Sequence, residues 1–124
     1  MARGLLIDTV KKEYREVEAA ELDTFYDLIK CRSIDIVQRR IGRRTYEIVC
    51  DDEGLFSDDP LISAVDYNLK MMLCGNLIIF GKADCNGELT DLSDRAIEHI
   101  KRHIHTVPTR LHPDGLLMIV GCLY

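Results

Sequence analysis

The sequence contains no tryptophan and few other aromatic residues, with three phenylalanines and five tyrosines among 124 positions. A hydrophobic core must therefore be built mainly from leucine, isoleucine and valine. Only three prolines are present, which argues against an extended or disordered chain. The length suits a single folded domain spanning residues 1–124 and is too short for two.

No stretch of the sequence is apolar for long enough to cross a bilayer. Leu5-Leu6-Ile7 is followed at once by Asp8 and soon by further charges, so we expect no secretory signal. The five cysteines are scattered and odd in number, and none forms a C-x-x-C pair. Such cysteines are typical of reduced, buried thiols. We therefore expect a protein of the reducing cytoplasm that does not contact a membrane.

Positive charge is also scarce, because 16 lysines and arginines stand against 21 aspartates and glutamates, for a formal net charge of −5. A general nucleic-acid-binding protein needs clustered positive charge to displace counterions from phosphates, so this class is disfavoured. The sequence contains no G-x-S-x-G, P-loop or dinucleotide-binding motif. We therefore favour a protein that is not an enzyme, and we assign it no cofactor.

The sequence does contain one strongly apolar stretch, Leu77-Ile78-Ile79-Phe80, which is bracketed by Gly75 and Gly81. Its apolar residues follow one another without alternation, which is typical of a short strand covered on both faces. The stretch therefore predicts a strand in the middle of a sheet, with other elements packed above and below it.

The remaining patterns predict an α+β fold, with a mostly antiparallel sheet of five to six strands and two main helices. Strands are expected at residues 5–8, 14–18, 33–40, 44–50 and 116–120, in addition to the central one. The charged strand at 14–18 suits a sheet edge. Helices are expected at 20–30 and after Ser93, where Ile97, Ile100 and Ile104 form a buried stripe. Residues 61–74 permit either a short helix or an irregular cover over the sheet.

Several stretches of the chain also resemble a known family. They are Cys31-Arg32-Ser33-Ile34-Asp35-Ile36-Val37, Cys50-Asp51-Asp52-Glu53-Gly54-Leu55, Gly75-Asn76-Leu77-Ile78-Ile79 and Leu89-Thr90-Asp91-Leu92-Ser93-Asp94. Together they are similar to domain of unknown function 3846, a family of small phage and mobile-element proteins. The resemblance covers about residues 4–105 and leaves residues 106–124 as a C-terminal strand extension. It implies a habitat in phages or mobile elements, but no agreed activity.

Four arginines surround the expected hairpin tip at Gly42: Arg39, Arg40, Arg43 and Arg44. Arginine is well suited to bidentate contacts with phosphate or carboxylate groups. One interpretation is therefore a ligand-binding site for an anion or an acidic partner surface. The other is a solvated hairpin whose charges pair with nearby carboxylates.

Three other groups of residues have a weaker claim to a site. The acidic loop at residues 51–59 offers oxygen ligands for Mg²⁺ or Ca²⁺, but three consecutive acids before Gly54 do not match an EF-hand loop. His99 and His103 have the spacing of paired zinc ligands, yet Ile100 replaces the glutamate of the metalloprotease motif, and the helical wheel predicts exposed histidines. Cys74 has apolar neighbours, which make a thiol inert. We therefore assign neither a metal site nor a catalytic residue.

The sequence thus favours a small non-catalytic binding or interaction module in an infected or plasmid-bearing bacterial cell. It would act on a host protein or on an anionic small molecule. The alternatives are a metal-dependent hydrolase or transferase that uses the acidic loop at 51–59, and a nucleic-acid-binding module. A homo-oligomer remains open.

Overall fold

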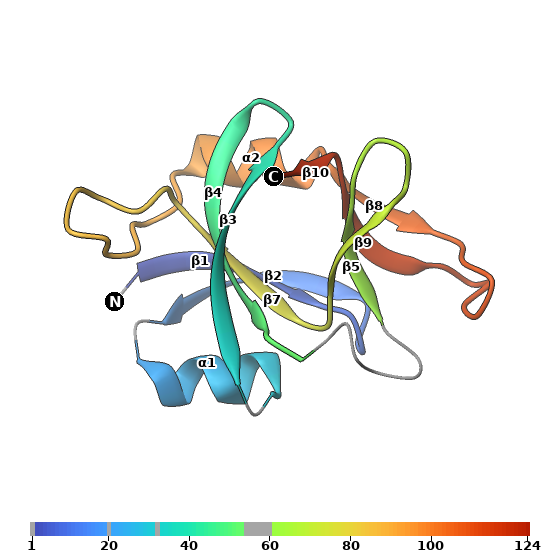
Figure 1. Cartoon of the computed structure of the whole chain (residues 1–124), viewed down its shortest axis with the longest axis horizontal. Helices are drawn as coiled ribbons and strands as arrows, with labels where there is room; N and C mark the ends of the chain where they lie inside the picture. Colours follow the sequence, from blue (N-terminus) through green and yellow to red (C-terminus); the bar gives the residue numbers. More distant parts are fainter. Residues whose placement is uncertain (1, 20, 32, 54–60) are drawn as a thin grey trace.

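The computed structural model describes residues 2–19, 21–31, 33–53 and 61–124. Within these ranges it contains ten strands and two helices (Figure 1). In chain order they are β1 (Ala2–Asp8), β2 (Glu13–Ala19), α1 (Leu22–Ile29), β3 (Ile34–Ile41), β4 (Arg44–Asp51), β5 (Ile62–Val65), β6 (Met71–Cys74), β7 (Leu77–Phe80), α2 (Asp94–Lys101), β8 (Ile104–Val107), β9 (Leu116–Val120) and β10 (Cys122–Leu123). The predicted α+β class and its two helices are confirmed. Neither helix in the described part of the chain is long and apolar enough to span a membrane.

Six strands form one antiparallel sheet in the order β10-β3-β4-β7-β1-β2. β7 lies inside this sheet, paired with β4 on one side and β1 on the other. All four of its side chains are buried. The charged strand β2 is at the edge, where its exposed charges remain solvated. The predictions for the central strand and for the edge strand are therefore confirmed.

The two faces of this sheet support separate hydrophobic clusters. Leu77 and Ile79 point into a cluster that includes buried residues of α2 and of the second sheet, whereas Ile78 and Phe80 point into a cluster that includes α1. The Phe80 ring meets the Phe25 ring of α1 edge to face, with centroids 5.9 Å apart. α1 and α2 accordingly lie on opposite sides of the sheet (Figure 1). Cover on both faces explains why the sequence of β7 shows no alternation.

A second sheet, which the sequence patterns did not predict, has the strand order β6-β5-β9-β8. The expectation of a short helix or irregular cover at residues 61–74 is wrong, because β5 and β6 form an antiparallel pair there. The pair has irregular register, and β5 runs parallel to β9. Ile104 was expected in the helical stripe, but it begins β8 instead. Four-residue strands with a bulge carry too little periodicity to distinguish them from a helical turn.

The C-terminal residues join the two sheets. β9 lies in the second sheet, and after Gly121 the chain continues as β10, which pairs with β3 at the edge of the first sheet. The Gly121 amide donates to the Val65 carbonyl at 2.9 Å, and the Gly121 carbonyl accepts from the Gly42 amide at 3.1 Å. This glycine therefore connects β5 to the turn of the β3–β4 hairpin.

Helix α2 begins as the sequence predicts. The Ser93 hydroxyl oxygen accepts a hydrogen bond from the Ala96 amide at 3.1 Å. We expect Ser93→Ala to lower the free energy of unfolding by about 1 kcal/mol, because an amide at the helix start loses its partner. Chemical denaturation of the two proteins measures this. Ser93→Asp, which keeps a capping oxygen, is the control, and an equal loss in both variants would contradict the capping role.

Candidate functional site

The four arginines of the β3–β4 hairpin do not converge on one point. Arg39 lies over the Tyr124 ring, with its guanidinium carbon 4.6 Å from the ring centroid. Arg40, the next residue along the strand, donates from Nε to the Tyr124 carbonyl at 3.2 Å. Arg43 follows the turn at Gly42 and is exposed. Arg39 and Arg40 thus both contact Tyr124, whereas Arg44 borders a depression beside α2.

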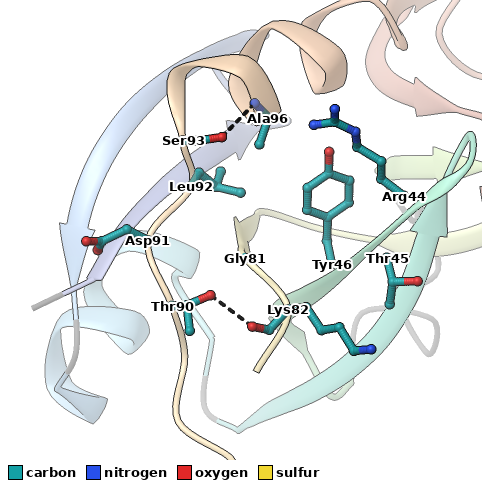
Figure 2. Close-up of a pocket in the computed structure, with 10 residues that line it drawn as sticks. All are labelled: Arg44, Thr45, Tyr46, Gly81, Lys82, Thr90, Asp91, Leu92, Ser93 and Ala96. Atoms are coloured by element: carbon teal, nitrogen blue, oxygen red, sulfur yellow. Dashed lines mark hydrogen bonds between the residues drawn. The ribbon is translucent and has the colours of Figure 1, made fainter. Parts of the chain in front are cut away.

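Arg44 lies next to α2, on the same face of β4 as Tyr46, which is buried. It borders two neighbouring depressions, which we call together the Arg44 groove. The first has a volume of about 550 Å³ and is lined by Arg44, Thr45, Tyr46, Gly81, Lys82, Thr90, Asp91, Leu92, Ser93 and Ala96 (Figure 2). The second, of about 560 Å³, is lined by Arg44, Asp94, Arg95, Glu98, His99 and Arg102.

The acidic residues that line the groove are held by other cations or amides. The Arg3 amide donates to Asp91 at 2.7 Å, and the Arg3 side chain forms an ion pair with Asp94 at 2.8 Å. Glu98 pairs with Lys101 at 3.6 Å. Carboxylates engaged in this way provide less compensation for positive charge inside the groove.

The arginines of the groove, by contrast, lack acidic partners. Among the residues that the structure describes, no carboxylate lies within 4.0 Å of a guanidinium nitrogen of Arg44, Arg95 or Arg102. Lys82 also lines the first depression, but Figure 2 shows its ammonium group pointing away from the Arg44 guanidinium. The groove is therefore bordered by guanidinium groups on a protein whose net charge is negative. This arrangement suits an anion, because a guanidinium binds phosphate or carboxylate through two parallel hydrogen bonds.

A tyrosine and a histidine connect Arg44 to α2. The Tyr46 hydroxyl and His99 Nδ1 are 2.8 Å apart, and Figure 2 shows the Arg44 guanidinium beside the same hydroxyl. Burial raises the pKa of Tyr46, and the hydrogen bond with Arg44 opposes that rise. Burial also lowers the pKa of His99, and the charges of His103, Arg44 and Arg102 lower it further. These surroundings favour the neutral form of the His99 ring.

The expectation that His99 and His103 are exposed is wrong, since both are half-buried. His103 Nδ1 is 2.9 Å from the Val120 carbonyl oxygen. The turn at Gly42 packs over the pair: a Cβ on this glycine would lie 2.9 Å from His103 Nε2 and 3.3 Å from His99 Nε2. A helical wheel considers only one helix, so it could not show that the hairpin covers this side of α2.

Two carboxylates in the described part of the acidic loop accept hydrogen bonds from other residues. Asp51 accepts a hydrogen bond from the Glu53 amide at 2.9 Å, and Asp52 accepts one from the Ser33 hydroxyl at 3.4 Å. The rest of this loop, residues 54–60, lies outside the described residues. Across the described ranges, no group of three or more histidine, cysteine, aspartate or glutamate side chains could hold a metal ion. The metal-dependent alternative stays a prediction.

The cysteines differ sharply in exposure. Burial raises the pKa of the Cys50 thiol to about 12 and the pKa values of Cys74 and Cys122 to about 11. Cys85 is exposed and Cys31 is half-buried. We expect Cys85 to react first with a thiol reagent at neutral pH, while the three buried thiols react only after unfolding, because the thiolate is the reactive form. Timed mass spectrometry of the native protein measures this, and rapid modification of Cys50 would contradict the burial.

Sequence reasoning missed most residues of the groove. Arg95 lies in α2 and Arg102 directly follows it, seven positions later, a spacing that places two residues on the same side of a helix. That spacing was available from the sequence, but their proximity to Arg44 depends on how the hairpin packs against the helix. Lys82 lines the groove from the segment that directly follows β7.

The described residues form a small α+β protein with a groove lined by Arg44, Arg95 and Arg102 beside its second helix. The chain belongs to the family described as Domain of unknown function (DUF3846), whose model matches residues 2–105. The resemblance inferred from the sequence is therefore confirmed, over nearly the same residues. No curated protein and no solved structure matches the chain.

Proposed function

We propose that this protein is a non-catalytic binding protein that holds an anionic small molecule in the Arg44 groove. The observation that supports this most strongly is the set of three arginines, Arg44, Arg95 and Arg102, that border the groove without a carboxylate partner in the described part of the chain. Such groups gain most from an anion that brings several acceptor oxygens. In the phage or mobile-element setting that the family resemblance implies, the protein would sequester this molecule in the cytoplasm of the bacterial cell.

The predicted site at Arg39, Arg40, Arg43 and Arg44 is accordingly narrowed to Arg44. Arg39 and Arg40 contact Tyr124, so we assign them a structural role and not a role in ligand binding. A binding role also agrees with the raised pKa of the buried thiols, because Cys50, Cys74 and Cys122 are poor nucleophiles when protonated.

Isothermal titration calorimetry with pyrophosphate tests the proposal. We expect binding to the wild-type protein, and a loss of affinity of roughly ten- to a hundredfold in Arg44→Ala and in Arg102→Ala, since each removes a charged hydrogen-bond donor. Arg44→Lys keeps the charge but not the planar guanidinium. Its affinity for pyrophosphate should therefore fall between that of the wild type and that of Arg44→Ala.

Arg110→Ala is the matched control, because Arg110 is an exposed arginine of the loop before β9 and does not line the groove. Its affinity for pyrophosphate should equal that of the wild type. If Arg110→Ala and Arg44→Ala weaken binding equally, the interaction is a general charge effect and the groove is not the site.

A further inference from the structure

We infer that the Arg44 groove takes up its anion together with a proton, and that His99 holds this proton. The inference rests on the proposed function, because it concerns how the same site is regulated by pH. It assigns His99 of α2 as the residue that is protonated when the ligand binds. The Tyr46 hydroxyl of β4 responds to this protonation by changing its hydrogen bond.

The geometry at His99 supplies a bond that can reverse its direction. The Tyr46 hydroxyl lies 2.8 Å from His99 Nδ1, and the two rings are stacked with centroids 6.0 Å apart. When His99 is neutral and its Nδ1 carries no proton, the hydroxyl must donate. When Nδ1 is protonated, the imidazolium donates and the hydroxyl oxygen accepts. The single hydroxyl proton of Tyr46 is then free to donate toward the groove that this residue lines.

The charges that face His99 explain why an anion would promote this change. Arg44 approaches from β4, and Arg102 and His103 lie in the turn that follows α2. Burial is the largest cause of the lowered pKa of His99 in the free protein, and each of these charges lowers it further. An anion placed among them would offset their repulsion and favour the charged imidazole.

The acids on the same side of α2 do not already supply this compensation. Asp94 pairs with Arg3, and Glu98 pairs with Lys101. Arg95 adds another positive charge to the wall of the second depression. The negative charge that would stabilise a protonated His99 must therefore come mainly from the ligand.

The direction of the pH effect follows from these shifts. The pKa of His99 is below its ordinary value in the free protein, and it is higher in the complex. Affinity must then increase as the pH falls through the interval between the two pKa values. Below the lower of them both states are protonated, and above the higher one both are neutral, so the affinity levels off at each end.

Sulfate is the probe that isolates this effect, because it carries the same charge from about pH 5 to about pH 8.5, the range in which histidine titrates. We expect the dissociation constant for sulfate to fall with decreasing pH, by up to about tenfold per pH unit, since one proton is taken up. His99→Gln should give a dissociation constant that does not change with pH. His105→Gln is the matched control, because His105 is exposed on β8, and it should keep the wild-type profile.

Each possible result of the sulfate titrations either supports the inference or overturns it. Sulfate binding whose strength is independent of pH would overturn it while leaving the proposed function intact, whereas a wild-type protein that binds neither sulfate nor pyrophosphate would overturn both. A His99→Gln variant that keeps the wild-type pH profile would also overturn it. If that variant does not fold, an NMR titration of the His99 ring protons in the wild type replaces it: the pKa of His99 should rise on adding sulfate, and an unchanged value contradicts the inference.

Discussion

Replacing Ile79 with alanine is expected to lower the free energy of unfolding by about 2–5 kcal/mol, the range for a buried isoleucine whose removal leaves a cavity. Ile79 is fully buried in β7, and it belongs to the cluster that includes α2 and the second sheet. Ile78→Ala should have an effect of similar size, because this side chain is equally buried on the opposite face, in the cluster that includes α1. Urea denaturation followed by circular dichroism measures both losses.

Ile36→Ala is the matched control for these two variants. Ile36 is also an isoleucine of the six-stranded sheet, but 49% of it is exposed, so its removal should change stability by no more than about 0.5 kcal/mol. If β7 is covered on both faces, Ile78→Ala and Ile79→Ala must each lose more free energy of unfolding than Ile36→Ala. If either variant matches Ile36→Ala, one face of β7 is open to water.

The second large effect is expected at Gly121, where the chain leaves the second sheet for the first. This residue has φ +91°, and an added Cβ would lie 2.9 Å from ring atoms of Tyr67. Gly121→Ala should therefore lower the free energy of unfolding by about 2–3 kcal/mol, mostly from backbone strain, with a smaller cost for displacing the Tyr67 ring, which is 61% exposed. Thermal and urea denaturation measure the loss.

Two further variants separate the strain from the overpacking. Gly87 also has a positive φ, +77°, but nothing lies within 4 Å of a Cβ added there. Gly87→Ala should thus show only the strain, about 1–2 kcal/mol. The double variant Tyr67→Ala/Gly121→Ala should regain the part of the free energy of unfolding that is lost through the contact with the Tyr67 ring. A Gly121→Ala protein as stable as the Gly87→Ala protein would mean that Tyr67 does not pack against this turn.

The parts of the fold that the sequence predicted are those with strong local patterns. β7 could be recognised because four consecutive apolar residues between two glycines require burial on both faces. Ser93 marked the start of α2 because its side chain satisfies a backbone amide of the first turn. The β3–β4 hairpin followed from two strand patterns that meet at Gly42, which has a positive φ of 61°. Each of these features is determined by neighbours in the chain.

The second sheet and the groove depend on contacts between distant residues, which one sequence does not display. β5 pairs with β9 across more than fifty positions, and neither strand alternates cleanly. The arginine cluster at Arg39 to Arg44 was predicted as one site, whereas Arg39 and Arg40 contact Tyr124 and Arg44 lies beside α2. The partners of Arg44 in the groove come from α2, so they could not be assigned before the packing of the hairpin on that helix was known.

Anomalous diffraction from crystals grown with selenate shows where a tetrahedral dianion binds, because selenium marks its position. We expect an anomalous peak in the Arg44 groove, within hydrogen-bonding distance of Arg44 and of Arg95 or Arg102. A fully occupied selenate elsewhere on the protein, with none in the groove, would contradict it.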